Sequence, residues 1–289
     1  MFLLALFGFG TKAGIMPLHV WLPEAHPAAP SHVSAVMSGV MIKTGIYGLL
    51  RTLTFLGQPP AWWGWVLIGV GAASGIMGVL MALSQRDLKR LLAYSSVENI
   101  GIICLGLGLG LLGISTHNPA LAALGLAGGL LHVWNHALFK SLLFLGAGAV
   151  VHATGTRDIE RLGGLLKKMP TAGITFFIAS AAICGLPPLN GFVSEVLIYV
   201  ASYTGVADAT SLSSVVVAGM VAVLCLAMIG GLAAACFTKA FGLAFLGSAR
   251  SLQADDVHQT PAVMVFPLVV LASLCVVGGL SGGLVLWVV

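Results

Sequence analysis

The chain has 289 residues, of which 58% are hydrophobic and only 8% are charged, and it contains 38 glycines. A soluble protein of this length needs far more charge on its water-facing surface, so the composition excludes a soluble fold and indicates a polytopic, all-α membrane protein. The formal net charge of +4 does not indicate a nucleic-acid partner, because the positive residues cluster in short loops, where they set membrane orientation.

Apolar stretches of about 20 residues, long enough to span a bilayer, follow one another along the chain. We predict spanning helices at 31–56, 62–84, 91–113, 119–152, 171–203, 213–246 and 260–288. The shorter stretch Met1 to Met16 is an eighth candidate and does not resemble a signal peptide, because Lys12 does not precede its apolar run. We expect about eight transmembrane helices in one membrane domain, 1–289. The short first stretch indicates either a start partway through a larger protein or a helix that another segment completes.

Two of the predicted spans are interrupted by proline. The first breaks in MPLHVWLPEAHPAAPSH at Pro17, and the second breaks in CGLPPLNGF at Pro187 and Pro188. Free backbone groups at membrane depth are tolerated only where protein or a water-filled cavity satisfies them. Paired broken helices are typical of a transporter's site, and ordinary proline kinks are the alternative.

Four ionisable side chains lie inside otherwise apolar segments: Lys12, Lys43, Lys140 and Glu195. A charge at mid-membrane costs about 2.5 to 3.5 kcal/mol on insertion scales, so such residues usually line an ion pathway. Lys12 precedes the first break and Glu195 follows the second. Ion translocation is therefore the leading hypothesis.

One predicted span carries a cluster of titratable residues on a single helical face. His132, His136 and Lys140 are spaced four positions apart. Histidine titrates near neutrality and can pass a proton between neighbours. Two histidines at this spacing could also bind zinc, but no acidic or cysteine partner accompanies them on that helix. Glu98, within SSVENIG, is a weaker candidate, and Lys239 is interpreted as an anchor that snorkels to the interface.

No metal or cofactor site is predicted in the chain. The cysteines have no C-x-x-C spacing and are interpreted as small core residues: Cys104, Cys184, Cys225, Cys236 and Cys275. The histidines in or beside the proline-rich segment are expected to be solvated loop residues: His19, His26 and His32.

The loops predict orientation. The connections 85–90 and 153–170 carry the basic residues, whereas 17–30, 114–118 and 204–212 carry no lysine or arginine. The positive-inside bias places the basic loops in the cytoplasm and both termini outside.

Several long motifs together carry a family resemblance. The segments FGFGTKAGIMPLHVWLPEAHPAAPSHVSAVMSGVMIKTGIYGLLR, RDLKRLLAYSSVENIG, HALFKSLLFLGAGAVVHATGTRDI and GLPPLNGFVSEVLIY resemble the antiporter-like membrane subunits of respiratory complex I, multisubunit sodium/proton antiporters and energy-converting hydrogenases. The motifs SSVENIGI and CGLPPLNGFVSE most resemble those of the branch that contains hydrogenase-4 component B and the large membrane subunit of formate hydrogenlyase.

The resemblance implies the C-terminal part of a fourteen-helix fold with two inverted repeats, each containing one discontinuous helix. Residues 1–56 would end the first repeat, 62–246 would form the second, and 260–288 would be the terminal helix. Six helices would then precede Met1, including the one that carries the glutamate partner of Lys12.

The resemblance also implies a function. Protons, or sodium, would move through a relay formed by Lys12, Lys43, Lys140, Glu195, His132, His136 and Glu98. The chain would have no redox centre of its own and would work beside other membrane and hydrophilic redox subunits in the cytoplasmic (inner) membrane of a bacterium or archaeon. The alternatives are one component of a multisubunit sodium/proton antiporter, a stand-alone secondary transporter and a passive scaffold.

Overall fold

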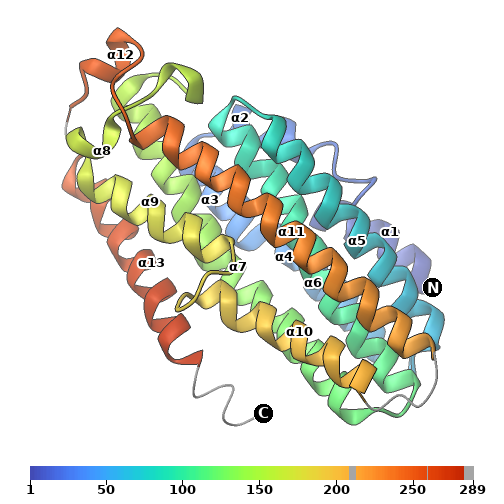
Figure 1. Ribbon diagram of the computed structural model, residues 1–289. Coiled ribbons are helices and arrows are strands. Elements are labelled where there is room, and N and C mark those ends of the chain that lie inside the picture. The colour runs from blue at the N-terminus through green and yellow to red at the C-terminus, as the bar shows by residue number, and fades with distance from the viewer. Residues whose placement is uncertain (208–212, 259, 283–289) are drawn as a thin grey trace.

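The computed structural model describes residues 1–207, 213–258 and 260–282, and within these ranges every regular element is helical (Figure 1). The helices are α1 (Phe2–Ala13), α2 (Leu22–Ala28), α3 (Ser31–Val36), α4 (Ile42–Phe55), α5 (Ala61–Ser84), α6 (Leu88–Ser115), α7 (Pro119–Thr154), α8 (Leu165–Lys168), α9 (Pro170–Ile183), α10 (Asn190–Ala207), α11 (Ser214–Phe245), α12 (Leu252–Asp255) and α13 (Ala262–Leu280). A π-helical turn, η1 (Met37–Met41), joins α3 to α4, and a 3-10 turn, η2 (Ile159–Arg161), precedes α8.

Six of the seven long predicted spans are confirmed, and the seventh, 171–203, is divided between α9 and α10. Among the described residues, six helices are long and apolar enough to cross a membrane: Ser31–Phe55, Ala61–Ser84, Leu88–Ser115, Pro119–Thr154, Ser214–Phe245 and Ala262–Leu280. The pairs α1/α2 and α9/α10 form the two discontinuous helices that the prolines predict. The end of the last predicted span, 283–288, and loop residues 208–212 lie outside the described residues.

Helix α6 lies at the centre of the assembly, packed between α5 and α7 (Figure 1). Of its most apolar 18-residue window, 94% is buried, far more than in any other candidate span. Glycines make this close packing possible, because a Cβ on Gly101 would lie 2.4 Å from the backbone nitrogen of Gly75, and one on Gly106 would lie 2.9 Å from Gly129. Small residues that let helix backbones approach are the usual device in membrane proteins, where apolar surfaces gain little by leaving lipid.

Both helix breaks begin at a left-handed glycine. Gly14 ends α1 with φ 81°, and Gly185 follows α9 with φ 62°. Such a conformation costs glycine nothing and is the common way to end a helix. At the first break, the backbone N–H groups of Gly14 and Ile15 both donate to the Gly10 carbonyl.

The predicted basic loops meet at one end of the molecule and hold the end of α2. Arg157 Nε lies 2.9 Å from the Asp87 carboxylate, and Arg157 Nη1 donates to the Pro27 carbonyl. Lys89 Nζ donates to the Ala29 carbonyl at 2.8 Å. Cations are favourable at a helix C-terminus, so these contacts fix the second half of the first discontinuous helix against α6 and α7.

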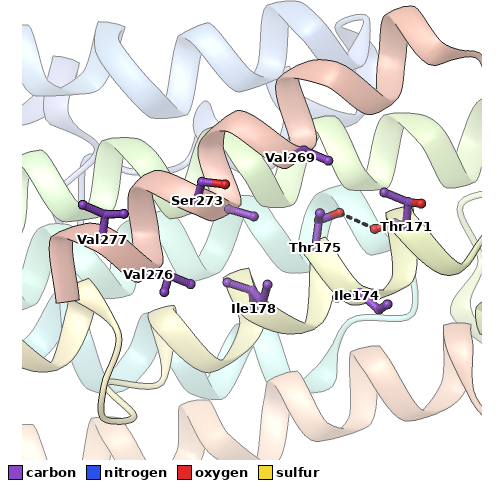
Figure 2. A pocket seen from close by; sticks show the side chains of 9 residues that line it. Thr171, Ile174, Thr175, Ile178, Val269, Ser273, Val276 and Val277 are labelled. Carbon is purple, nitrogen blue, oxygen red and sulfur yellow. Dashed lines mark hydrogen bonds between the residues drawn. The ribbon is translucent and has the colours of Figure 1, made fainter. Parts of the chain in front are cut away.

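A lateral groove of about 440 Å³ lies between α9 and α13 (Figure 2). Its walls are mostly aliphatic, and in Figure 2 Ile178 of α9 lies beside Val276 of α13. The Thr175 hydroxyl donates back to the carbonyl of its own helix at 2.9 Å. The groove is therefore suited to an apolar neighbour and not to a polar ligand.

Candidate functional site

Lys140 lies fully buried on α7, where the helix faces α6. Its Nζ donates to the Leu92 carbonyl at 2.9 Å and to the Ser95 hydroxyl. The ammonium also lies 6.0 Å from the ring centroid of Phe237 on α11. In the described part of the chain, no carboxylate lies within salt-bridge distance of this ammonium, so neutral oxygen atoms are its direct partners.

Lys43 is buried at the start of α4, directly after the π-helical turn. Its Nζ donates to the Ser38 carbonyl within that turn. The Ser38 hydroxyl lies 2.8 Å from the Ser96 hydroxyl on α6, which donates at 3.0 Å to the same Leu92 carbonyl that Lys140 uses. The two lysines are therefore linked through Ser38, Ser96 and the Leu92 carbonyl. A π-helical turn inside an α-helix often marks a functional position.

His132 extends this network to the second discontinuous helix. Its Nε2 lies 3.1 Å from Asn99 Oδ1 on α6, and its Nδ1 lies 3.0 Å from the Ser194 hydroxyl on α10. The Asn99 amide in turn donates to the Ser95 carbonyl at 2.9 Å. Residues linked by hydrogen bonds thus connect Lys43 on α4 with the first turn of α10, and they include Lys140 and His132.

His136 and Glu98 are buried beside this network without hydrogen-bond partners of their own. Both ring nitrogens of His136 and both carboxyl oxygens of Glu98 lack a partner among the described residues. The His136 ring stacks near His132, with 6.3 Å between centroids. Glu98 lies within electrostatic range of Lys140 and Glu195. Buried polar groups without a partner are energetically costly.

Glu195 is positioned by the second helix break. It lies near the start of α10, half-buried, with its carboxylate against Gly185. A Cβ at Gly185 would lie 2.3 Å from Glu195 Oε2, so a larger residue there would displace the carboxylate. The tight turn that ends α9 therefore also makes room for the carboxylate.

Lys12 is not part of this cluster. It is exposed on α1, on a helix whose outer face also exposes Leu4 (72%) and Phe7 (64%). The structure thus gathers Lys43, Lys140, Glu195, His132, His136 and Glu98 in the interior and leaves Lys12 at its periphery.

The expectation of solvated loop histidines is wrong for His26 and His19. His26 is fully buried and stacks on Phe144 of α7 with 4.5 Å between ring centroids. His19 is 8% exposed, and its ring lies 6.2 Å from that of Tyr94. The proline-rich segment folds back into the helix assembly, whereas His32 is exposed as expected.

Sequence reasoning also missed the polar partners of the charged residues. Buried side-chain amides and hydroxyls complete the network: Ser38, Ser95, Ser96, Asn99, Asn135, Asn190 and Ser194. Their signal was present in the sequence, because asparagine is costly inside an apolar span unless it is hydrogen-bonded. Lys239, interpreted as a snorkelling anchor, donates to the carbonyls of Leu83 (2.8 Å) and Gln85 (3.0 Å) at the end of α5.

Comparison with known proteins places this arrangement in a family. The family model described as "NADH:quinone oxidoreductase/Mrp antiporter, TM" matches residues 1–225. The chain is 49% identical to hydrogenase-4 component B of Escherichia coli, over 97% of this chain and 42% of that protein. It is 45% identical to formate hydrogenlyase subunit 3 of the same organism, over 97% of this chain and 46% of that protein.

Solved structures agree with the sequence comparison. A chain of the Mrp complex from Dietzia sp. DQ12-45-1b superimposes with a TM-score of 0.79 at 25% identity, covering 97% of this chain and 56% of the other. A chain of an archaeal membrane-bound sulfane sulfur reductase superimposes with a TM-score of 0.77 at 32% identity, covering 96% and 44%. The chain spans less than half the length of the two curated relatives named above. It belongs to the family of NADH:quinone oxidoreductase and Mrp antiporter membrane subunits.

Proposed function

We propose that this chain translocates protons as the membrane subunit of a hydrogenase or NADH:quinone oxidoreductase type of complex. The observation that supports this most is the buried network that runs from Lys43 through Lys140 to His132 inside membrane-spanning helices. Charged and titratable groups at this depth are costly, and those that persist usually line an ion pathway.

The proposed relay has two kinds of member. Lys140 and Glu195 would load and release the proton. Each is an ionisable group on a helix of the interior cluster, Lys140 on α7 and Glu195 on α10. His132 and His136 would bind and release it on α7, since imidazole titrates near neutrality. Glu98 would pass the proton between Lys140 and Glu195. Lys43 would continue the path toward α4.

Lys12 would belong to the relay only in an assembly. An ammonium at membrane depth either finds a partner or gives up its proton, and Lys12 is exposed here beside apolar side chains. We propose that a neighbouring polypeptide brings a carboxylate to Lys12. In the same scheme, 1–56 ends one inverted repeat, 62–246 forms the next, and 260–288 is the terminal helix.

The energy for transport would come from partner subunits. Moving one charge against 100 mV costs about 2.3 kcal/mol, and the relay residues offer acid-base groups but no electron carrier. Other membrane and hydrophilic redox subunits would supply the free energy. The chain would lie in the bacterial or archaeal cytoplasmic membrane with its basic loops inside and both termini outside.

A role in a multisubunit sodium/proton antiporter is the second candidate. It is favoured by 37% identity to one of the Na(+)/H(+) antiporter subunits of Alkalihalophilus pseudofirmus, over 96% of this chain and 34% of that protein. The relay would then exchange protons for sodium instead of coupling to redox chemistry.

The test is Glu195→Gln in the assembled complex reconstituted into vesicles. The amide keeps the shape but cannot titrate, so we expect proton uptake to fall by about 10² or more, the usual contribution of a positioned acid-base group. Uptake at the normal rate by an assembled Glu195→Gln complex would refute the relay. A dependence of proton movement on sodium, without any electron donor, would favour the antiporter instead.

A further inference from the structure

The first turn of α10 is tied to α7 by a compact group of buried polar side chains. The Asn135 amide donates to the Asn190 carbonyl at 2.7 Å and to the Ser194 hydroxyl oxygen at 3.1 Å. The Asn190 amide returns toward Asn135 Oδ1 at 3.3 Å. Ser194, Asn190 and His132 are fully buried. This group sits directly after the second helix break and directly before Glu195.

The partners of His132 fix which of its nitrogens carries a proton. Asn99 uses its amide N–H on the Ser95 carbonyl, so Oδ1 is the atom that faces His132 Nε2, and it can only accept. Nε2 must therefore carry a proton whether the imidazole is neutral or charged. Any change of protonation takes place at Nδ1, which faces the Ser194 hydroxyl at 3.0 Å.

Ser194 has one hydroxyl proton and two acceptors for it. The hydroxyl lies 2.9 Å from the Gly191 carbonyl and 3.0 Å from His132 Nδ1. When His132 is neutral, Nδ1 is an acceptor and takes the Ser194 proton. When Nδ1 is protonated, it donates to the Ser194 oxygen, and the hydroxyl turns to the Gly191 carbonyl. Asn135 donates to the Ser194 oxygen in both states. When the imidazole is charged, both lone pairs of that oxygen therefore accept a hydrogen bond, one from Asn135 and one from His132.

We propose that Ser194 is a positioning residue that holds His132 ready at Nδ1 for proton exchange and reports its protonation state to the turn that carries Glu195. When Nδ1 gains a proton, another titratable group of the relay loses one, and Ser194 carries a single hydroxyl proton before and after. The switch needs rotation of a single hydroxyl and no movement of heavy atoms. This inference rests on the proposed function and adds a residue to it that lies outside the set of charged groups.

Other titratable groups lie on the helices that surround His132. They are His136 and Lys140 on α7, Glu98 on α6, Lys43 on α4 and Glu195 on α10. Because all of them are retained in a Ser194 variant, a change in the pH profile of that variant reports the lost hydroxyl partner of His132.

The experiment compares Ser194→Ala with Ser202→Ala in the reconstituted complex. Ser202 is the matched control, because it is a fully buried serine two turns further along α10 whose hydroxyl donates only to its own helix, at 2.8 Å from the Ile198 carbonyl. We expect Ser194→Ala to slow proton uptake by about tenfold, the rate equivalent of one hydrogen bond to a charged group, and to shift its pH optimum. Ser202→Ala should stay within about twofold of the unmodified complex.

A spectroscopic readout separates positioning from folding. In complexes labelled with ¹⁵N-histidine, the His132 signals, assigned by their loss in His132→Gln, should change at Nδ1 and not at Nε2 in Ser194→Ala. An unchanged pH profile and unchanged Nδ1 signal in assembled Ser194→Ala would overturn the inference. If those unchanged results are found while Glu195→Gln still abolishes proton uptake, the inference about Ser194 fails and the proposed relay stands. Normal uptake in both variants would reject the relay itself.

Discussion

The buried ammonium of Lys140 offers the clearest test of whether the network transports or merely stabilises. Lys140→Met keeps the aliphatic stem and removes the charge and its bonds to Leu92 and Ser95. Two hydrogen bonds from a charged donor contribute roughly 3 to 6 kcal/mol together, whereas burying the ammonium costs several kcal/mol. The Leu92 carbonyl also keeps the hydroxyl of Ser96 at 3.0 Å. The free energy of unfolding should therefore change by no more than about 2 kcal/mol.

Transport should respond far more strongly than stability. If Lys140 exchanges protons, its loss should lower proton uptake by about 10² to 10⁴, measured by quenching of a pH-sensitive dye in vesicles. Lys239→Met is the matched control, because Lys239 also donates to two oxygen atoms, those of Leu83 and Gln85, but at the end of α5. Uptake at the control rate by assembled Lys140→Met would refute the reasoning. Loss of assembly in Lys140→Met alone would assign the residue a structural role.

Three further predictions follow from the packing and the loops. Gly101→Ala should destabilise the complex by about 1 to 3 kcal/mol, because its Cβ would meet the backbone of α5. Gly69→Ala should not, because a Cβ there would have nothing within 4 Å, and thermal unfolding in detergent compares the two variants. Arg86→Cys and Lys167→Cys should react with a membrane-impermeant thiol reagent only from the cytoplasmic side, and reaction from outside would reverse the proposed orientation. Lys12 should form a zero-length carbodiimide cross-link to a carboxylate of a neighbouring polypeptide in the native complex, and its absence would remove Lys12 from the relay.

Much of the fold could be predicted because each span is a local property of the chain. Hydropathy over about 20 residues locates a membrane helix, and proline with glycine locates its breaks, as at Gly14 and Gly185. Burial of Lys43 and Lys140 followed from their depth in these spans. The prediction for His26 was wrong because its proline-rich surroundings suggested a solvated loop, and only the packing of α2 against the helix assembly shows the ring stacked on Phe144.

In the candidate site, the charged residues could be predicted from the sequence but their contacts could not. His132 meets Asn99 and Ser194 across 33 and 62 residues of sequence, and Lys140 meets Ser95 across 45. No periodicity within one helix specifies these meetings, since they depend on which faces of α6, α7 and α10 approach one another.

The sequence by itself determined the membrane class, the spans, the two breaks and which ionisable groups enter the bilayer, because transfer of a side chain from water depends on that side chain and its near neighbours. Only the tertiary structure decided that Lys43, Lys140 and His132 share one network while Lys12 faces outward. Close approach of α5, α6 and α7 through their glycines sets those distances, and a hydrogen bond forms or fails within a few tenths of an ångström.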